Sequence, residues 1–117
     1  MSRITDVDEA IALYREAAIR AACIATSDPQ ESNKWADKGM ACYRSLSATP
    51  EGISRIIELM SDDNPYVRGL AAAHSLQWKP EEAKATLEII RDSDGPGAFE
   101  AKWTLIEYEN GSLTFGS

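Results

Sequence analysis

Five prolines divide this 117-residue chain into segments of about one helix each, and their spacing restricts the fold more than any other feature. Proline is favoured at the first position of a helix, where its missing N–H would have no partner in any case. After Pro50 the next three follow at intervals of 15, 15 and 16 residues, each before a segment with helical apolar periodicity. The spacing predicts helices that begin at Pro29, Pro50, Pro65, Pro80 and Pro96.

Polar residues beside these prolines support the same helix starts. Asp28, Thr49 and Asn64 each precede a proline and offer a side-chain oxygen that can cap the free amides of the first turn. Glu31, three residues after Asp28, comes close to completing a capping box. Gly111, which follows LIEYEN, is typical of a helix end.

A sixth helix is predicted before the first proline. Apolar residues recur there at alternating intervals of four and three residues, which places them on one face of a helix. They are Val7, Ile11, Tyr14, Ala18, Ala21 and Ala25. Because no segment has the alternating pattern of a β-strand, we expect an all-α protein of about six helices.

The apolar positions also repeat with a period of about 30 residues. Three series keep this offset: Leu46, Leu76 and Leu105; Cys42, Ala72 and Ala101; and Met40, Leu70 and Phe99. The intervening helices match as well, at Ile53 and Ala83, Ile57 and Leu87, Leu59 and Ile89, and Met60 and Ile90. A fixed period of this kind indicates stacked helical hairpins. We expect three antiparallel hairpins, with the alanine-rich segment 69–76 packed between its neighbours.

The stretch NPYVRGLAAAHSL, followed by EEAKATLEII and the acidic turn RDSD, resembles a HEAT-type repeat, whose pattern contains proline, Val-Arg, paired alanines and a leucine. The closing GAFEAKWTLIEYENG is similar to the end of a small bacterial family of HEAT-like domains with no assigned activity. The resemblance spans residues 33–110 and is strongest over 62–105. It implies an α-α superhelix in which the second helix of each hairpin lines the binding surface. The chain departs from the pattern at Phe99-Glu100, where Val-Arg is expected, and in the long connection TSDPQESN.

The length and composition fit a single domain. Hydrophobic residues make up 44% of the chain and charged residues 26%, which is enough apolar material for one core. We interpret the chain as one HEAT-like domain, with residues 1–28 as an N-terminal capping helix and residues 111–117 as a C-terminal tail. Leu113 and Phe115 in this tail are expected to cover an open end of the stack, in the same chain or in a homodimer.

The charge of the chain argues against several partners and locations. Its 12 Lys and Arg are outnumbered by 19 Asp and Glu, and a net charge of −7 repels nucleic acids and anionic membranes. The sequence has neither an apolar run long enough to span a membrane nor the pattern of a signal peptide, so we expect a cytoplasmic protein. Cys23 and Cys42 with one histidine do not make a zinc site, and no motif indicates a cofactor.

We expect a non-enzymatic role in binding another protein or peptide. Residues 33–48 and 64–78 are neutral to basic, whereas residues 50–63 and 80–94 each carry a net charge of −3. The first pair therefore suits an acidic or mixed-charge protein segment. The candidate partner-binding residues, on the second, fourth and sixth helices, are Trp35, Lys38, Tyr66, Arg68, His74, Lys102 and Trp103. One form of this role is an immunity-type or inhibitor-type protein that neutralises a basic enzyme.

Other interpretations compete with this one. Arg68 matches the arginine of the repeat pattern and is expected to pair structurally with an acidic turn, at Asp63 or Asp92. His74, the only histidine, raises the alternative of a small-molecule-binding or lyase-like enzyme with a pocket near it. A nucleic-acid binder is a third class, but it requires a continuous basic strip that this sequence does not supply.

Overall fold

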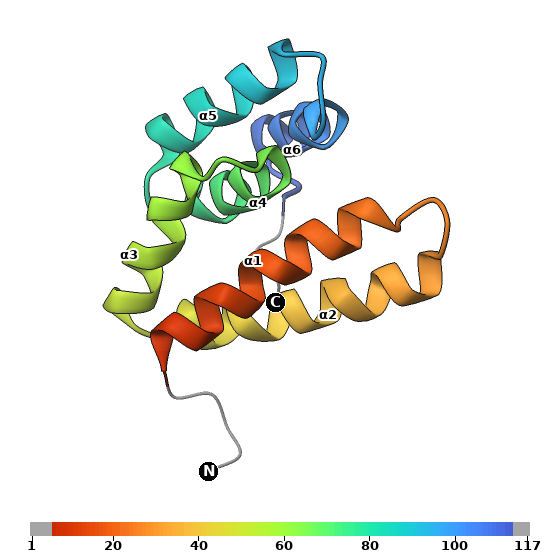
Figure 1. Ribbon diagram of the computed structural model, residues 1–117. Helices are drawn as coiled ribbons and strands as arrows, with labels where there is room; N and C mark the ends of the chain where they lie inside the picture. The colour runs from red at the N-terminus through yellow and green to blue at the C-terminus, as the bar shows by residue number, and fades with distance from the viewer. Residues whose placement is uncertain (1–5, 114–117) are drawn as a thin grey trace. The chain divides into compact units, whose positions relative to one another are not determined.

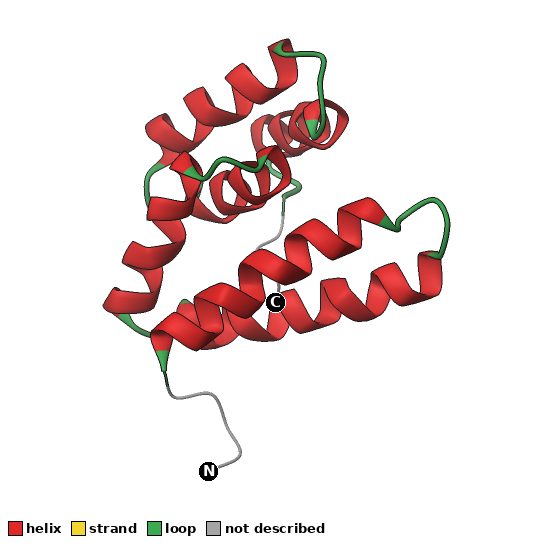
Figure 2. Cartoon of the chain, in the orientation of Figure 1, coloured by secondary structure: helices red, strands yellow, loops and turns green. Residues whose placement is uncertain are grey.

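The computed structural model describes residues 6–113 and is all-helical, with no strand among those residues (Figures 1 and 2). This confirms the predicted fold class. Its elements are α1 (Val7–Cys23), α2 (Pro29–Leu46), α3 (Pro50–Glu58), the short 3₁₀ helix η1 (Leu59–Ser61), α4 (Pro65–Ser75), α5 (Pro80–Asp92) and α6 (Ala98–Asn110).

Four of the five prolines stand at the first residue of a helix, as the spacing predicts. The predicted caps are also in place. The side chain of Asp28 accepts a hydrogen bond from the N–H of Glu31 at 3.1 Å, and that of Asn64 accepts from the N–H of Tyr66 at 2.9 Å. Thr49 Oγ1 accepts from the N–H of Gly52 at 3.1 Å. These local contacts satisfy amides that have no partner within the helix.

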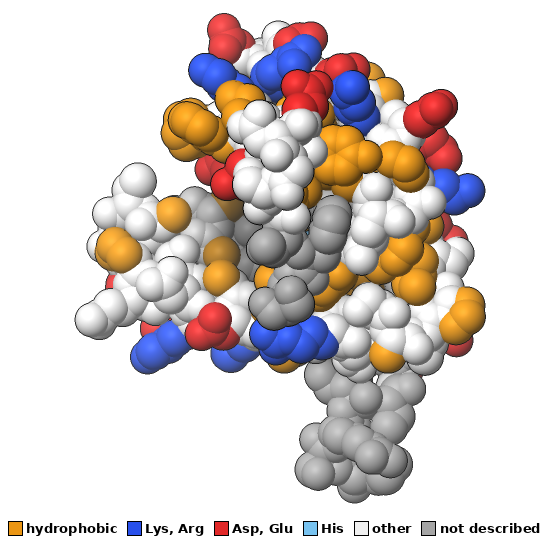
Figure 3. Space-filling view, turned by 180° about the vertical axis from the view of Figure 1, so that it is seen from behind, with side chains coloured by type: hydrophobic (Ala, Val, Ile, Leu, Met, Phe, Trp, Pro, Cys, Tyr) orange, Lys and Arg blue, Asp and Glu red, His pale blue; other side chains and the backbone are white. Residues whose placement is uncertain are grey.

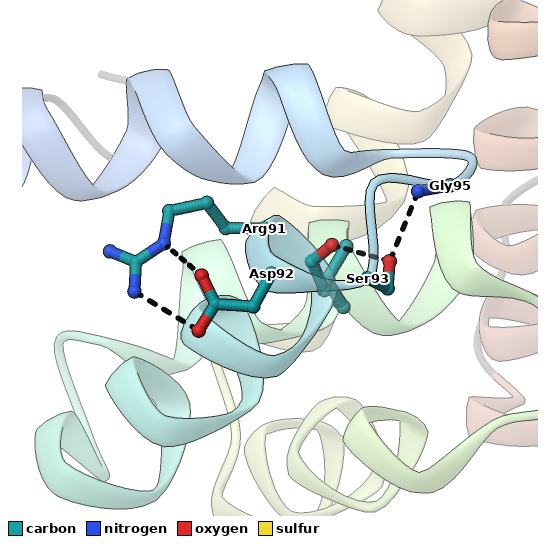
Figure 4. Close-up of polar contacts among 5 residues, drawn as sticks. Arg91, Asp92, Ser93 and Gly95 are labelled. Carbon is teal, nitrogen blue, oxygen red and sulfur yellow. Dashed lines mark hydrogen bonds and ion pairs between the residues drawn. The ribbon is translucent and has the colours of Figure 1, made fainter.

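The fifth proline does not begin a helix, because the chain turns twice before α6. Asp94 has a φ of 60° and Gly97 a φ of 84°, both left-handed, so α6 begins at Ala98 rather than at Pro96. The turn is held at the end of α5 by Ser93, whose Oγ donates to the carbonyl of Ile90 at 2.6 Å and accepts from the N–H of Gly95 at 3.2 Å (Figure 4). On the surface beside it Arg91 donates to the carboxylate of Asp92 (Figure 4).

The contacts of the chain divide it into two compact units, an N-terminal unit, Met1–Ile56, and a C-terminal unit, Ile57–Ser117. In the N-terminal unit α1 and α2 lie side by side and run in opposite directions (Figure 1). Gly39 permits their close approach, since a Cβ at this position would lie 3.2 Å from the Cβ of Ala17. The predicted stripe is buried at Ile11 and Tyr14, whereas Ala25 lies beyond the end of α1 and is exposed.

In the C-terminal unit α4 packs against α5, α6 and η1, and α5 packs against α6. The buried residues of this core are Ala72, Leu76, Ala83, Leu87, Ile90, Ala101 and Leu105. Leu113 packs against them from the predicted tail, while Phe115 lies outside the described residues. The small side chains of α4 allow α5 and α6 to pack closely against it. This close packing explains why the segment is rich in alanine.

The 30-residue periodicity corresponds only in part to burial. The series Cys42, Ala72, Ala101 and the series Leu46, Leu76, Leu105 are buried throughout. In contrast, Phe99 and Ile89, which occupy matching positions of other series, are 68% and 70% exposed. The single HEAT-like domain and the stack of three hairpins stay predictions.

Replacing Ala72 with phenylalanine is expected to destabilise the protein. Ala72 is fully buried in the core of the C-terminal unit, so a larger side chain overpacks the core at a cost of about 1–3 kcal/mol. Urea denaturation followed by circular dichroism measures this change. Ala85→Phe on the exposed side of α5 is the control and is expected to alter stability by less than about 0.5 kcal/mol. Equal stability of the two variants would contradict the placement of Ala72.

Candidate functional site

The seven predicted partner-binding residues fall into both units. Trp35 and Lys38 lie on α2 in the N-terminal unit. The other five lie on α4 and α6 in the C-terminal unit: Tyr66, Arg68, His74, Lys102 and Trp103. Each unit therefore has its own set of predicted residues.

The surface in the N-terminal unit is an open groove of about 400 Å³ that runs along α1 beside Trp35, and we call it the Trp35 groove. Its lining residues are Ala12, Arg15, Glu16, Ile19, Arg20, Cys23, Ile24 and Trp35. All except Trp35 belong to α1 or to its C-cap. The lining combines apolar side chains with long cations, a composition suited to contacts with a partner protein.

Two cations are held against the ring of Trp35. Lys38 Nζ lies 4.3 Å from the ring centroid and Arg20 Cζ lies 5.1 Å from it, both within the range of a cation–π contact. Arg20 also pairs with Glu16, its Nε 2.8 Å from a carboxylate oxygen. These contacts position the indole ring, and they place the positive charges of Lys38 and Arg20 at the edge of the groove.

The two cysteines differ in accessibility. Cys23 is exposed and lines the groove, whereas Cys42 is buried and burial raises the pKa of its thiol. A thiol reagent is therefore expected to modify Cys23 first, because the thiolate is the nucleophile and access limits its reaction.

The surface in the C-terminal unit is formed by α6. Phe99 and Trp103 are 68% and 47% exposed, and their rings meet edge to face with centroids 6.1 Å apart. Lys102 is exposed on the same helix. Exposed hydrophobic side chains interspersed with acidic and basic ones are visible on the face of the molecule in Figure 3. We call Phe99 and Trp103 the α6 aromatic pair.

The predicted residues of α4 are less accessible. Arg68 donates to the backbone carbonyls of Asp62 at 3.0 Å and Asp63 at 3.1 Å, so it holds the acidic turn through its main chain rather than through the predicted carboxylate. His74 is only 7% exposed, and burial lowers the pKa of its imidazole to about 4. His74 thus offers almost no surface to a partner, although it is one of the predicted partner-binding residues. Tyr66 is half-buried.

The sequence analysis missed several residues of these surfaces, although a signal for them was present. Ala12, Ile19 and Cys23 follow one another at helical intervals on a face of α1 other than the stripe that contains Ile11. Phe99 was assigned to a repeating core position, but its i, i+4 spacing with Trp103 is equally typical of a surface pair.

Within residues 6–113 no three or more His, Cys, Asp or Glu side chains are grouped so as to hold a metal ion. Across the same range, no helix combines the length and the apolar character needed to cross a membrane. Comparisons with protein-family models, with curated proteins and with solved structures gave no match for this chain.

Proposed function

We propose that this protein is a non-enzymatic binding module that holds another protein on α6. The observation that carries the proposal is the exposure of two large aromatic side chains, Phe99 and Trp103, in contact with each other. Exposed aromatic groups at one place are typical of interaction surfaces, and tryptophan is the residue most enriched among those that dominate binding energy.

The geometry of the pair suits an anchor. Each of the two side chains has few rotatable bonds. The edge-to-face contact, with ring centroids 6.1 Å apart, restricts both rings before a partner binds. A partner that buries them therefore loses less side-chain entropy than it would with flexible residues. The neighbouring Lys102 provides a polar rim on the same helix.

The charge of the C-terminal unit indicates the chemistry of the partner. Residues 57–113 contain eleven Asp and Glu against five Lys and Arg, a net charge of −6 with His neutral. Such a field attracts a basic protein and raises its association rate. We therefore propose a basic partner with an apolar pocket, consistent with an immunity-type or inhibitor-type role. His74, buried and neutral at pH 7, has no catalytic step in this proposal.

Trp103→Ser is expected to weaken partner binding roughly thirty-fold, about 2 kcal/mol, because it removes the larger ring of the anchor. The 117-residue chain is immobilised and exposed to an extract of its native cells, the retained protein is identified by mass spectrometry, and its affinity is then measured with purified components. Since Trp103 is partly exposed, thermal unfolding should be nearly unchanged.

Ile89→Ser is the matched control, because Ile89 is 70% exposed on α5 and its replacement removes apolar surface outside the α6 aromatic pair. It is expected to leave the affinity within about three-fold of wild type. Retention of the same partner by the Trp103→Ser variant at unchanged affinity would refute the α6 site. Retention of a second copy of this chain in place of a basic protein would refute the proposed partner chemistry.

A further inference from the structure

The Trp35 groove follows one face of α1 from Ala12 to the C-cap of the helix. Its α1 residues start at Ala12 and recur at intervals of three and four as far as Ile24, the C-cap of the helix. A separate face of α1 carries the buried residues Ile11 and Tyr14. At a rise of 1.5 Å per residue, the twelve steps from Ala12 to Ile24 give a groove roughly 18 Å long. A linear groove of this length matches about three turns of a guest helix.

The groove is positively charged within an acidic protein. Two of its lining residues are cations, Arg15 and Arg20, against one carboxylate, Glu16. Lys38, held over the ring of Trp35, adds a further positive charge at the edge. The lining thus carries a net charge of +1, or +2 with Lys38, although the whole chain carries −7. A local excess of this kind selects for carboxylates at short range.

From this combination of shape and charge we infer that the Trp35 groove binds an acidic amphipathic helix of a partner protein. Apolar side chains of the guest at i, i+3/i+4 and i+7 pack against Ile19, Ile24 and the ring of Trp35. Glutamates beside them face Lys38 and Arg20, the two cations that lie over the ring of Trp35. The inference concerns the N-terminal unit and does not depend on the function proposed for α6.

Arg20 has a distinct part in this recognition. It is paired with Glu16 and lies 5.1 Å from the centroid of Trp35, so it is oriented before the guest arrives. A guest carboxylate that approaches the guanidinium extends this ion pair into a network. Because the groove is open to solvent, the attraction is expected to weaken as salt rises.

The probe for the test is a synthetic amphipathic peptide of about 15 residues with leucines along one face and glutamates on both sides of it. Matched peptides carry glutamine or lysine in place of every glutamate. Binding is measured by calorimetry at low and high salt, and Cys23 serves as a local reporter through its rate of alkylation by iodoacetamide. Binding in the groove is expected to slow this alkylation at least about five-fold, since it covers the thiol.

Lys38→Glu is the decisive variant and Lys34→Glu its charge-matched control. Both reverse one exposed cation on α2, but Lys38 lies 4.3 Å from the centroid of the Trp35 ring at the edge of the groove, whereas Lys34 lies 3.7 Å from Glu31. We expect Lys38→Glu to weaken binding of the acidic peptide at least about ten-fold and Lys34→Glu by less than about two-fold. Both variants should fold normally, which circular dichroism verifies.

Several results would overturn the inference. Equal losses in the two variants would mean that the peptide responds only to overall charge. An unchanged rate of Cys23 alkylation in the presence of bound peptide would place the peptide elsewhere. Tight binding of the glutamine peptide would show an apolar site without charge selectivity. Sedimentation that reveals a dimer broken by Lys38→Glu would assign the groove to a second copy of the chain.

Discussion

Replacing Gly52 with alanine is expected to lower the free energy of unfolding by about 3 kcal/mol, because the added methyl group overlaps the backbone of the preceding helix. Gly52 is buried near the start of α3. A Cβ at this position would lie 2.6 Å from the carbonyl carbon of Leu46 and closer still to its oxygen. Both are backbone atoms at the end of α2, so no side-chain rotation can relieve the overlap.

The turn between α2 and α3 must therefore open to admit the methyl group. That movement strains the contact in which the N–H of Gly52 donates to Thr49 Oγ1 at 3.1 Å. Elsewhere in a helix the same substitution raises the free energy of unfolding by about 1 kcal/mol, because alanine loses less backbone entropy on folding than glycine does. The expected sign at Gly52 is thus opposite to the intrinsic preference.

Gly69→Ala is the matched control for this prediction. Gly69 is also within a helix, α4, but a Cβ there would lie 3.8 Å from Ile90 Cδ1, an ordinary van der Waals distance. This variant is expected to be neutral or more stable by up to about 1 kcal/mol. Urea denaturation of both variants measures the difference. If Gly52→Ala proved as stable as Gly69→Ala, the close approach of α3 to Leu46 would be wrong.

The second large effect is a loss of stability on acidification that depends on His74. Burial lowers the pKa of this imidazole to about 4 in the folded protein, whereas an unfolded histidine has a pKa of about 6.5. Well above pH 6.5 the side chain is neutral in both states and has no effect on the pH dependence. As the pH falls from 6.5 towards 4, the unfolded chain binds a proton that the folded chain does not, so the free energy of unfolding decreases.

The difference between the two pKa values corresponds to a loss of about 3 kcal/mol, complete near pH 4. Carboxylates also titrate at the acidic end of this window, so the measurement is a comparison with His74→Gln, which has no proton to bind. Urea denaturation at pH 7.0, 6.0, 5.0 and 4.5 is expected to give a steeper decline for the wild-type protein. Parallel pH profiles of wild type and variant would show that His74 is solvated in the folded state.

Much of the helical framework was predictable because its signals are local. A proline has the same preference for the first turn wherever the helix later packs, and the caps at Asp28 and Asn64 form within three residues of their own backbone. The two buried series with a period of about 30 residues were also visible in the sequence, since apolar spacing reports the side of a helix that must avoid water. The prediction that the last helix begins at Pro96 was wrong, because the spacing of the prolines does not indicate that Gly97 has a left-handed φ.

The candidate site was less predictable, because exposure depends on what packs against each residue. Trp103 and Lys102 were expected at a surface and are exposed there, whereas His74 was expected at the same surface and is buried. Phe99 shows the reverse, since an apolar residue at a repeating position turned out to be 68% exposed. The type of residue alone does not distinguish these outcomes.

The sequence by itself determined that the chain is helical and where most helices begin, because hydrogen bonds to caps and the geometry of proline involve only neighbouring residues. Only the tertiary structure decided that Arg20 meets Trp35, fifteen positions away along the chain, and that Arg68 binds the carbonyls of a turn. The physical reason is that these contacts arise from the way helices and turns pack against each other, and packing depends on the shapes of many side chains at once.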